Sequence, residues 1–331
     1  MNSDGDKETL NEFELIRRYF SRPVPPGYLG GGDDCALLPV SAGKQLATST
    51  DLLIEGRHFL PDADPGSLGH KALAVNVSDL AAMGAQPVGC LLGLSFPQVD
   101  HAWLAAFSDA FYAYAKSAHC PLIGGDTTRS DRGIVISVTV FGQVEPGRAL
   151  RRDAACPGDD LWVTGELGAP HIALQMLLGQ RLFDPSLLAA TREALDRPCP
   201  PWRFAQGLPG LANAALDISD GLLQDLNHIL QASDCGATVR FGDLPVAPAL
   251  DALDQDAVRE AVLSGGDVYQ LCFTAPVAHR EQIAGLARRC GTKTTRVGTI
   301  QRERQLTVLD EAGEVFPVSS HGFDHFGLRN A

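Results

Sequence analysis

The sequence predicts an α/β protein, in the wider sense of an α+β chain with two domains. Strand-like runs of Val, Ile and Leu alternate with helical segments in both halves. The 331 residues are enough for two hydrophobic cores. A segment rich in Pro, Gly and Arg at 145–160 interrupts the alternation. We therefore expect an N-terminal domain at 1–152 and a C-terminal domain at 153–331.

In the N-terminal half, apolar spacing predicts each element in turn. Helices are expected at 13–20, at 68–84 and after Asp100, which is placed to cap the third; strands are expected at 45–50, 88–96 and 134–142. The segment 68–84 is apolar on nearly every face, so this helix should be buried. Within it Asn76 and Asp79 are three residues apart and share one side. A buried carboxylate needs a partner, so Asp79 is either a hydrogen-bonded core residue or a metal ligand.

The C-terminal half repeats the alternation. Strands are expected at 161–164, 269–274, 294–300 and 306–309, and helices near His171, from Leu222 and at 283–290. A further strand ends in the segment Leu216–Gly221, which carries Asp217 and Asp220. Asp220 is placed either to cap the helix that follows or to bind a ligand, whereas Asp217 has no capping role.

Composition and charge exclude several classes of protein. The net charge of −13 argues against nucleic acid or an anionic membrane as the main partner. No apolar run is long enough for a membrane span, and the polar segment Met1–Asn11 does not have the pattern of a targeting peptide. The eight cysteines show no metal-binding spacing, which predicts small buried thiols in a reducing compartment. We therefore expect a cytoplasmic protein.

The most informative pattern is a repeated Gly-Gly-Asp triplet. It occurs at 31–33, 124–126 and 265–267, and we expect a glycine turn at each place. Other aspartates stand in similar surroundings, at Asp51 (expected at the end of a strand), Asp79, Asp217 and Asp220. Carboxylates that are brought together repel one another unless a cation lies between them. The pattern therefore predicts a site for Mg²⁺, which prefers oxygen ligands.

Familiar phosphate and hydrolase motifs are missing. There is no P-loop, dinucleotide fingerprint, nucleophile elbow or His-Glu-x-x-His. The basic run 148–152 is either a solvated linker or a phosphate contact, since Arg binds phosphate in a bidentate manner. Metal-assisted positioning needs little covalent chemistry from the protein. The residues alone therefore predict a Mg²⁺-dependent enzyme that acts on phosphates.

Six segments resemble the thiamine-monophosphate kinase family. They are the motifs at 30–38, 49–59, 71–85, 122–129, 217–222 and 322–326, in order along the chain. The resemblance implies a fold shared with aminoimidazole-ribonucleotide synthetase, in which the N-terminal sheets of a homodimer form a barrel-like interface. It also implies direct transfer of a phosphoryl group from ATP to thiamine monophosphate, without a phosphoenzyme.

The resemblance also implies roles for individual residues. The expected Mg²⁺ ligands are Asp33, Ser49, Thr50, Asp51, Asp79, Asp126 and Asp217, with Asp220 holding a further ion. The expected ATP contacts, besides the ligand Asp126, are Gly125, Arg152 and Ser219, and the expected thiamine monophosphate contacts are His58, Asp267 and Phe323.

One motif departs from the family pattern. Where the family reads Ser-Gly-Gly-Glu-Asp-Tyr/Phe-Glu-Leu, this chain reads Ser-Gly-Gly-Asp-Val-Tyr-Gln-Leu at 264–271. The change affects the expected substrate contacts more than metal binding. Alternatives to the kinase are sister enzymes of the same fold, selenophosphate synthetase and the hydrogenase-maturation dehydratase, or a non-catalytic metal-dependent binding module. Selenophosphate synthetase requires a reactive Cys or selenocysteine and a Lys near its N-terminus, and the dehydratase requires a C-terminal Cys. We expect neither, since the first cysteine of this sequence is Cys35 and its last residues are Leu-Arg-Asn-Ala.

Overall fold

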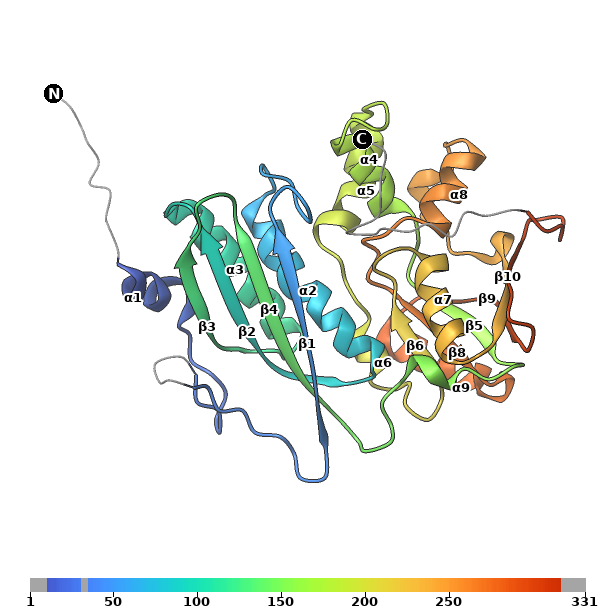
Figure 1. Cartoon of the computed structure of the whole chain (residues 1–331), viewed down its shortest axis with the longest axis horizontal. Coiled ribbons are helices and arrows are strands. Elements are labelled where there is room, and N and C mark those ends of the chain that lie inside the picture. Colours follow the sequence, from blue (N-terminus) through green and yellow to red (C-terminus); the bar gives the residue numbers. More distant parts are fainter. Residues whose placement is uncertain (1–10, 31–34, 317–331) are drawn as a thin grey trace.

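The structure, a computed structural model, describes residues 11–30 and 35–316. Two α/β domains lie side by side, each built on a mixed sheet with helices packed against it (Figure 1). This confirms the predicted two-domain α/β fold, and the barrel-like dimer interface stays a prediction. Within the described residues, no helix is both long enough and apolar enough to span a bilayer.

The N-terminal sheet has four strands in the order β1-β4-β2-β3. Their bounds are β1 Gln45–Ile54, β2 Gln86–Phe96, β3 Leu122–Arg129 and β4 Val135–Val144. β2 and β3 are parallel, and the other neighbouring pairs are antiparallel. The helices α2 (Pro65–Ala82) and α3 (His101–Ser117) cover one face, and a short helical segment, α1 (Glu12–Leu15) continuing as a π-helix to Phe20, packs at α3.

Alternation along the strands separates the two faces of this sheet. In β4 every second residue is buried, including Ile136, Val138 and Val140, which pack in one core with α2 and α3. On the opposite face, Leu46, Leu52 and Ile54 of β1 are 49%, 56% and 41% exposed. We call this the outer face of the N-terminal sheet.

The helix α2 packs against both domains. It is buried over almost its whole length, as predicted, and Asp64 caps it by accepting a hydrogen bond from the backbone N–H of Ser67. At its C-terminal end, Ala81 and Ala82 pack in a cluster with Phe204 and other residues of the C-terminal domain. One face of α2 therefore lies at the seam between the domains.

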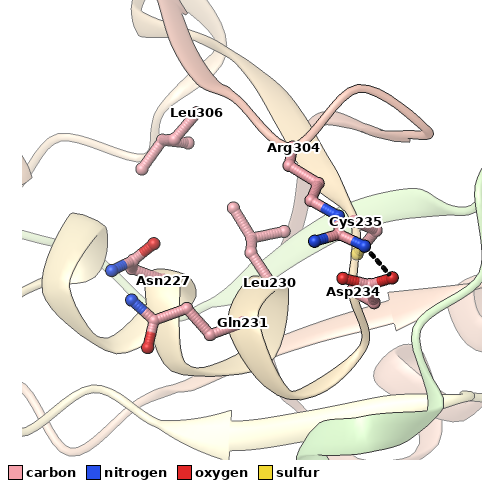
Figure 2. Close-up of a pocket in the computed structure, with 7 residues that line it drawn as sticks. All are labelled: Asn227, Leu230, Gln231, Asp234, Cys235, Arg304 and Leu306. Atoms are coloured by element: carbon pink, nitrogen blue, oxygen red, sulfur yellow. Dashed lines mark hydrogen bonds and ion pairs between the residues drawn. The ribbon is translucent and has the colours of Figure 1, made fainter.

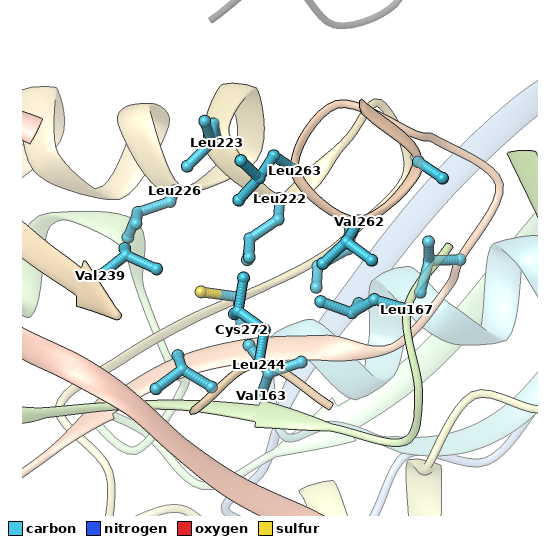
Figure 3. Packing of buried hydrophobic residues seen from close by; sticks show 14 of the residues in the cluster. Val163, Leu167, Leu222, Leu223, Leu226, Val239, Leu244, Val262, Leu263 and Cys272 are labelled. Atoms are coloured by element: carbon cyan, nitrogen blue, oxygen red, sulfur yellow. The ribbon is translucent and has the colours of Figure 1, made fainter. Parts of the chain in front are cut away.

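The C-terminal sheet has six strands in the order β10-β7-β9-β5-β8-β6. Their bounds are β5 Asp160–Thr164, β6 Ala214–Asp217, β7 Gly236–Arg240, β8 Leu271–Ala275, β9 Thr294–Gln301 and β10 Leu306–Leu309. The helices are α4 Ala169–Leu177, α5 Pro185–Asp196, α6 Trp202–Ala205, α7 Leu222–Ala232, α8 Gln255–Leu263 and α9 Arg280–Cys290. Figure 3 shows the larger core, in which Leu222 and Leu226 of α7 and Val262 of α8 pack over Cys272 of β8.

Several local expectations were wrong. The triplet 124–126 forms no turn but lies inside β3, where a Cβ on Gly125 would come within 1.9 Å of the carbonyl oxygen of Leu92 on β2. Asp51 lies within β1 rather than at its end. Tyr269 adopts a left-handed backbone conformation and precedes β8. The prediction of buried cysteines holds for only half of the eight, and the sequence did not predict α5, α6, α8 or β7.

Candidate functional site

Two carboxylates lie between β1 and α2. The Oγ of Ser49 donates a hydrogen bond to Oδ2 of Asp79 at 2.6 Å. The backbone N–H of Asp51 donates to Oδ1 of Asn76 at 3.1 Å. Because Ser49 and Asp51 are two apart on a strand, both side chains point toward α2. The structure therefore brings together three of the predicted Mg²⁺ ligands.

Asp217 approaches this pair from the other domain. It ends β6 and is 8% exposed. Burial and the neighbouring Asp79 carboxylate raise the pKa of Asp217 to about 7. Burial and Asp79 likewise raise the pKa of Asp51 to about 6. Asp51, Asp79 and Asp217, which we call the carboxylate group, thus form an electrostatically unfavourable set at the domain seam.

The loop after β6 is held by a carboxylate that the sequence analysis missed. Oδ2 of Asp225, on α7, accepts hydrogen bonds from the backbone N–H groups of Ser219, Asp220 and Gly221 at 3.0, 3.0 and 3.1 Å. Asp220 does not cap α7, whose N-cap residue is Gly221. The signal in the sequence was an acidic residue in the first turn of a helix, where a negative charge is favourable.

The segment Ser264–Leu271 lies beside this loop and is hydrogen-bonded to it. The backbone N–H of Asp267 donates to the carbonyl of Ser219, and that of Tyr269 to the carbonyl of Ile218, both at 2.8 Å. Asp267 and Tyr269 both adopt positive φ, at 60° and 51°. Burial and then the charges of Asp267, Asp51 and Asp217 raise the pKa of Tyr269 well above its usual value. Tyr269 therefore lies beside the carboxylate group.

A buried lysine reaches this segment from the N-terminal domain. Nζ of Lys71 on α2 lies 2.7 Å from Oδ1 of Asp267. The same Oδ1 accepts a hydrogen bond from the Tyr269 hydroxyl at 3.2 Å. Asp267, a predicted substrate contact, is thus engaged by two protein groups. The sequence signal for Lys71 was a charged residue inside an otherwise apolar helix.

Three other predicted residues differ in their surroundings. The positive charge of Arg152 partly offsets the burial that raises the pKa of Asp79, so the guanidinium lies near the carboxylate group. The hydroxyl of Thr50 instead bonds to Thr139 and to the carbonyl of Val138, away from Asp79. Nδ1 of His58 accepts the backbone N–H of Ile54, a local role at the end of β1.

Two further predicted residues, Gly125 and Asp126, do not lie in the carboxylate group. Gly125 and Asp126 are exposed on β3, which is the opposite edge of the sheet from β1. No hydrogen bond or ion pair in the described part of the chain joins Asp126 to the carboxylate group. Asp33 and Phe323 lie outside the described residues.

The donor set suits a hard cation, although it does not enclose one. Carboxylate and hydroxyl oxygens from Ser49, Asp51, Asp79 and Asp217 are ligands that Mg²⁺ accepts, and their mutual repulsion would be relieved by a positive charge. Within residues 11–30 and 35–316, no three acidic, histidine or cysteine side chains surround a single point closely enough to hold an ion. This pattern fits Mg²⁺, which is usually bound by one or two carboxylates together with substrate phosphates.

Two pockets of the described structure lie away from these residues. One, of about 330 Å³, lies beside α7 and contains Asn227, Gln231 and the ion pair Arg304–Asp234 (Figure 2). The other, of about 530 Å³, lies between the segment near Tyr28 and the strands β2 and β4. Neither is lined by a predicted site residue.

Comparison with known proteins places both domains in one family. Residues 32–144 match the family model described as "AIR synthase related protein, N-terminal domain", and residues 157–311 match the corresponding C-terminal domain. The thiamine-monophosphate kinase of Escherichia coli O157:H7 is 42% identical over 323 residues, which cover 95% of this chain and 98% of that protein.

Solved structures agree. The crystal structure of thiamine-monophosphate kinase from Stenotrophomonas maltophilia K279a has a TM-score of 0.81 at 40% identity, covering 91% of this chain and 95% of that one. AaThiL complexed with AMPPCP and TMP has a TM-score of 0.75 at 29% identity, covering 87% and 90%. The hydrogenase maturation protein HypE, at 20% identity, shares the fold alone. The chain belongs to the thiamine-monophosphate kinase family, within the AIR synthase related proteins.

Proposed function

We propose that this protein transfers the γ-phosphoryl group of ATP to thiamine monophosphate and so forms thiamine diphosphate. The observation that carries the proposal is the carboxylate group at the domain seam, where burial and the charge of Asp79 raise the pKa of the half-buried Asp51 to about 6 and that of the buried Asp217 to about 7. Buried carboxylates that repel one another are stable ligands only when a cation balances them. Family membership supports the choice of both substrates.

In this proposal the protein acts by positioning. Asp51, Asp79 and Asp217 would hold Mg²⁺ together with nucleotide phosphates, while Ser49 orients Asp79 by its hydrogen bond. Bound Mg²⁺ would neutralise the charge that develops on the transferred group. Arg152, close to Asp79, would contact ATP, with Gly125, Asp126 and Ser219 as further contacts. His58, Asp267 and Phe323 would contact thiamine monophosphate, and Asp33 and Asp220 would complete the metal sites.

We also propose that the active protein is a homodimer that pairs through the outer face of the N-terminal sheet. Leu46, Leu52 and Ile54 are 49%, 56% and 41% exposed on one face of β1, where Thr48 and Thr50 lie between Leu46 and Leu52. Large exposed apolar side chains gathered on one sheet face are typical of a surface that a second chain covers.

ADP release in the presence and absence of thiamine monophosphate tests the proposed reaction. With Mg²⁺ and ATP, ADP and thiamine diphosphate should appear in equal amounts, and neither should form when the acceptor or Mg²⁺ is omitted. ADP formation that does not depend on thiamine monophosphate would favour a sister activity. Binding of ATP without any turnover would favour the non-catalytic binding module.

A further inference from the structure

Lys71 is an unusual residue in its environment. It is 6% exposed on α2, a helix whose other buried residues are mostly Leu, Ala and Val. Burial of an ammonium group is costly unless a counter-charge accompanies it. The counter-charge is Asp267, whose Oδ1 lies 2.7 Å from Nζ of Lys71 and whose side chain is 26% exposed. The ion pair therefore joins the N-terminal domain to the C-terminal domain.

The partner of Lys71 lies in a strained turn. Asp267 and Tyr269 both have left-handed backbones, although neither is glycine. Such conformations persist only where the surrounding structure enforces them. Here the main chain is tied to the loop after β6 by the hydrogen bonds from Asp267 to Ser219 and from Tyr269 to Ile218. Lys71 and the Tyr269 hydroxyl hold the carboxylate of Asp267 itself.

Two cationic side chains near the carboxylate group interact with different aspartates. The charge of Arg152 acts on Asp79. Lys71 instead acts on Asp267, and the Tyr269 phenol that bonds to Asp267 lies close enough to Asp51 and Asp217 to be affected by their charges. Lys71 and Asp79 are eight residues apart on α2, which corresponds to about 12 Å along a helix. A donor and an acceptor that both carry phosphate need separate, fixed positions on either side of the transferred group.

We propose that Lys71 is a positioning residue for the acceptor. By holding the Asp267 carboxylate against α2, Lys71 fixes the turn at 265–269 and so sets where thiamine monophosphate lies relative to the carboxylate group. This inference rests on the proposed kinase function and on the expected contact between Asp267 and the acceptor. Lys71 thus affects the binding of thiamine monophosphate through Asp267 and does not affect the binding of ATP.

The test compares three variants by steady-state kinetics and thermal unfolding. Lys71→Met removes the charge but keeps the length, and Lys71→Arg keeps the charge. Arg280→Met is the matched control, because it breaks the pair in which Arg280 donates to the buried Asp160 at 2.5 Å, within the C-terminal domain. We expect Lys71→Met to raise the KM for thiamine monophosphate about tenfold or more and to leave the KM for ATP within about twofold. Lys71→Arg should recover part of this loss, and Arg280→Met should lower the Tm without changing either KM.

A merely structural role predicts a different pattern. If Lys71→Met lowers the Tm and leaves both KM values unchanged, or raises both equally, the proposal is overturned. An equal rise in the KM for thiamine monophosphate in Lys71→Met and Lys71→Arg would overturn the role of the charge. If Lys71→Met does not fold, Tyr269→Phe serves as the second variant, because it removes the other hydrogen bond to Asp267. Tyr269→Phe should raise the KM for thiamine monophosphate by less than the tenfold expected for Lys71→Met. An unchanged KM for thiamine monophosphate in Tyr269→Phe overturns the proposal. Absence of thiamine diphosphate formation by the unaltered protein would instead refute the proposed function.

Discussion

Replacing Asp217 by Asn should stabilise the metal-free protein and inactivate it. Asp217 is almost fully buried, and burial together with Asp79 raises its pKa to about 7. Asparagine has nearly the same shape but carries no charge, so the substitution removes the repulsion without leaving a cavity. A neutral amide is also a poor ligand for Mg²⁺. The two effects therefore have opposite signs.

The magnitude follows from the shift in pKa. The ordinary pKa of an aspartate is about 3.9, so the pKa of Asp217 is higher by about three, and each difference of one in pKa is equivalent to about 1.4 kcal/mol. The pKa of Asp217 is higher in the folded than in the unfolded protein. Below about pH 4 Asp217 is protonated in both states and does not destabilise the fold, and the folded protein loses stability as the pH rises toward about 7. At pH 8 the charge of Asp217 therefore lowers the free energy of unfolding by at most about 4 kcal/mol. We expect Asp217→Asn to gain about 1–4 kcal/mol there, or roughly 1–6 °C in Tm.

Thermal unfolding without metal, at pH 5 and pH 8, measures this effect. The unaltered protein should lose stability between these pH values, and Asp217→Asn should lose less. Asp225→Asn is the matched control, since burial and Asp220 also raise the pKa of Asp225 to about 7, yet its carboxylate accepts three backbone N–H groups. This control should gain less stability at pH 8 than Asp217→Asn, because an amide oxygen accepts the three backbone N–H groups more weakly than a carboxylate does. In the kinase assay, Asp217→Asn should lose activity by about 10–100-fold or more.

A lower Tm for Asp217→Asn than for the unaltered protein at pH 8 would refute this reasoning. It would show that Asp217 makes favourable contacts in the metal-free protein that outweigh the repulsion from Asp79. Near-normal activity would separately refute its role as a ligand.

Three further predictions concern other parts of the chain. Asp126→Asn should keep the Tm, because Asp126 is exposed on β3, but abolish turnover; activity close to normal at ordinary Mg²⁺ concentrations would exclude it as a ligand. Leu52→Asp should convert the dimer to a monomer in sedimentation experiments, because it places a charge on the outer face of the N-terminal sheet. The control Leu182→Asp, at a site 93% exposed in the other domain, should leave the dimer intact. A fully active monomer of the unaltered protein would contradict the dimer. Asp267→Glu should change the KM for thiamine monophosphate more than the KM for ATP, and adding Val268→Asp should lower the Tm because Val268 is 6% exposed in the core; unchanged KM values would remove the substrate role of Asp267.

The sequence alone determined the fold class and the chemistry of the site. Apolar periodicity predicted α2 and most strands, because their burial depends on spacing that is visible along the chain. Aspartates beside glycines and hydroxyl residues indicated Mg²⁺ and phosphate, because ligand preference depends on the type of side chain. The motifs carried the resemblance to the family.

Only the tertiary structure decided which of these residues meet. Asp51 and Asp217 are far apart in the chain, and their raised pKa values follow from burial and from Asp79, which spacing cannot predict. The triplet at 124–126 had the composition of a turn, yet pairing with β2 placed it in a strand where only glycine fits at Gly125.

The same limit explains the residues that the sequence missed. The sequence did not indicate a role for Lys71 within its apolar helix, because its counter-charge, Asp267, belongs to the other domain. Asp225 was hidden in an amphipathic helix, since its partners are backbone groups of the preceding loop. A buried charge acquires its role from the partner that folding supplies, and that partner cannot be read from its neighbours in the chain.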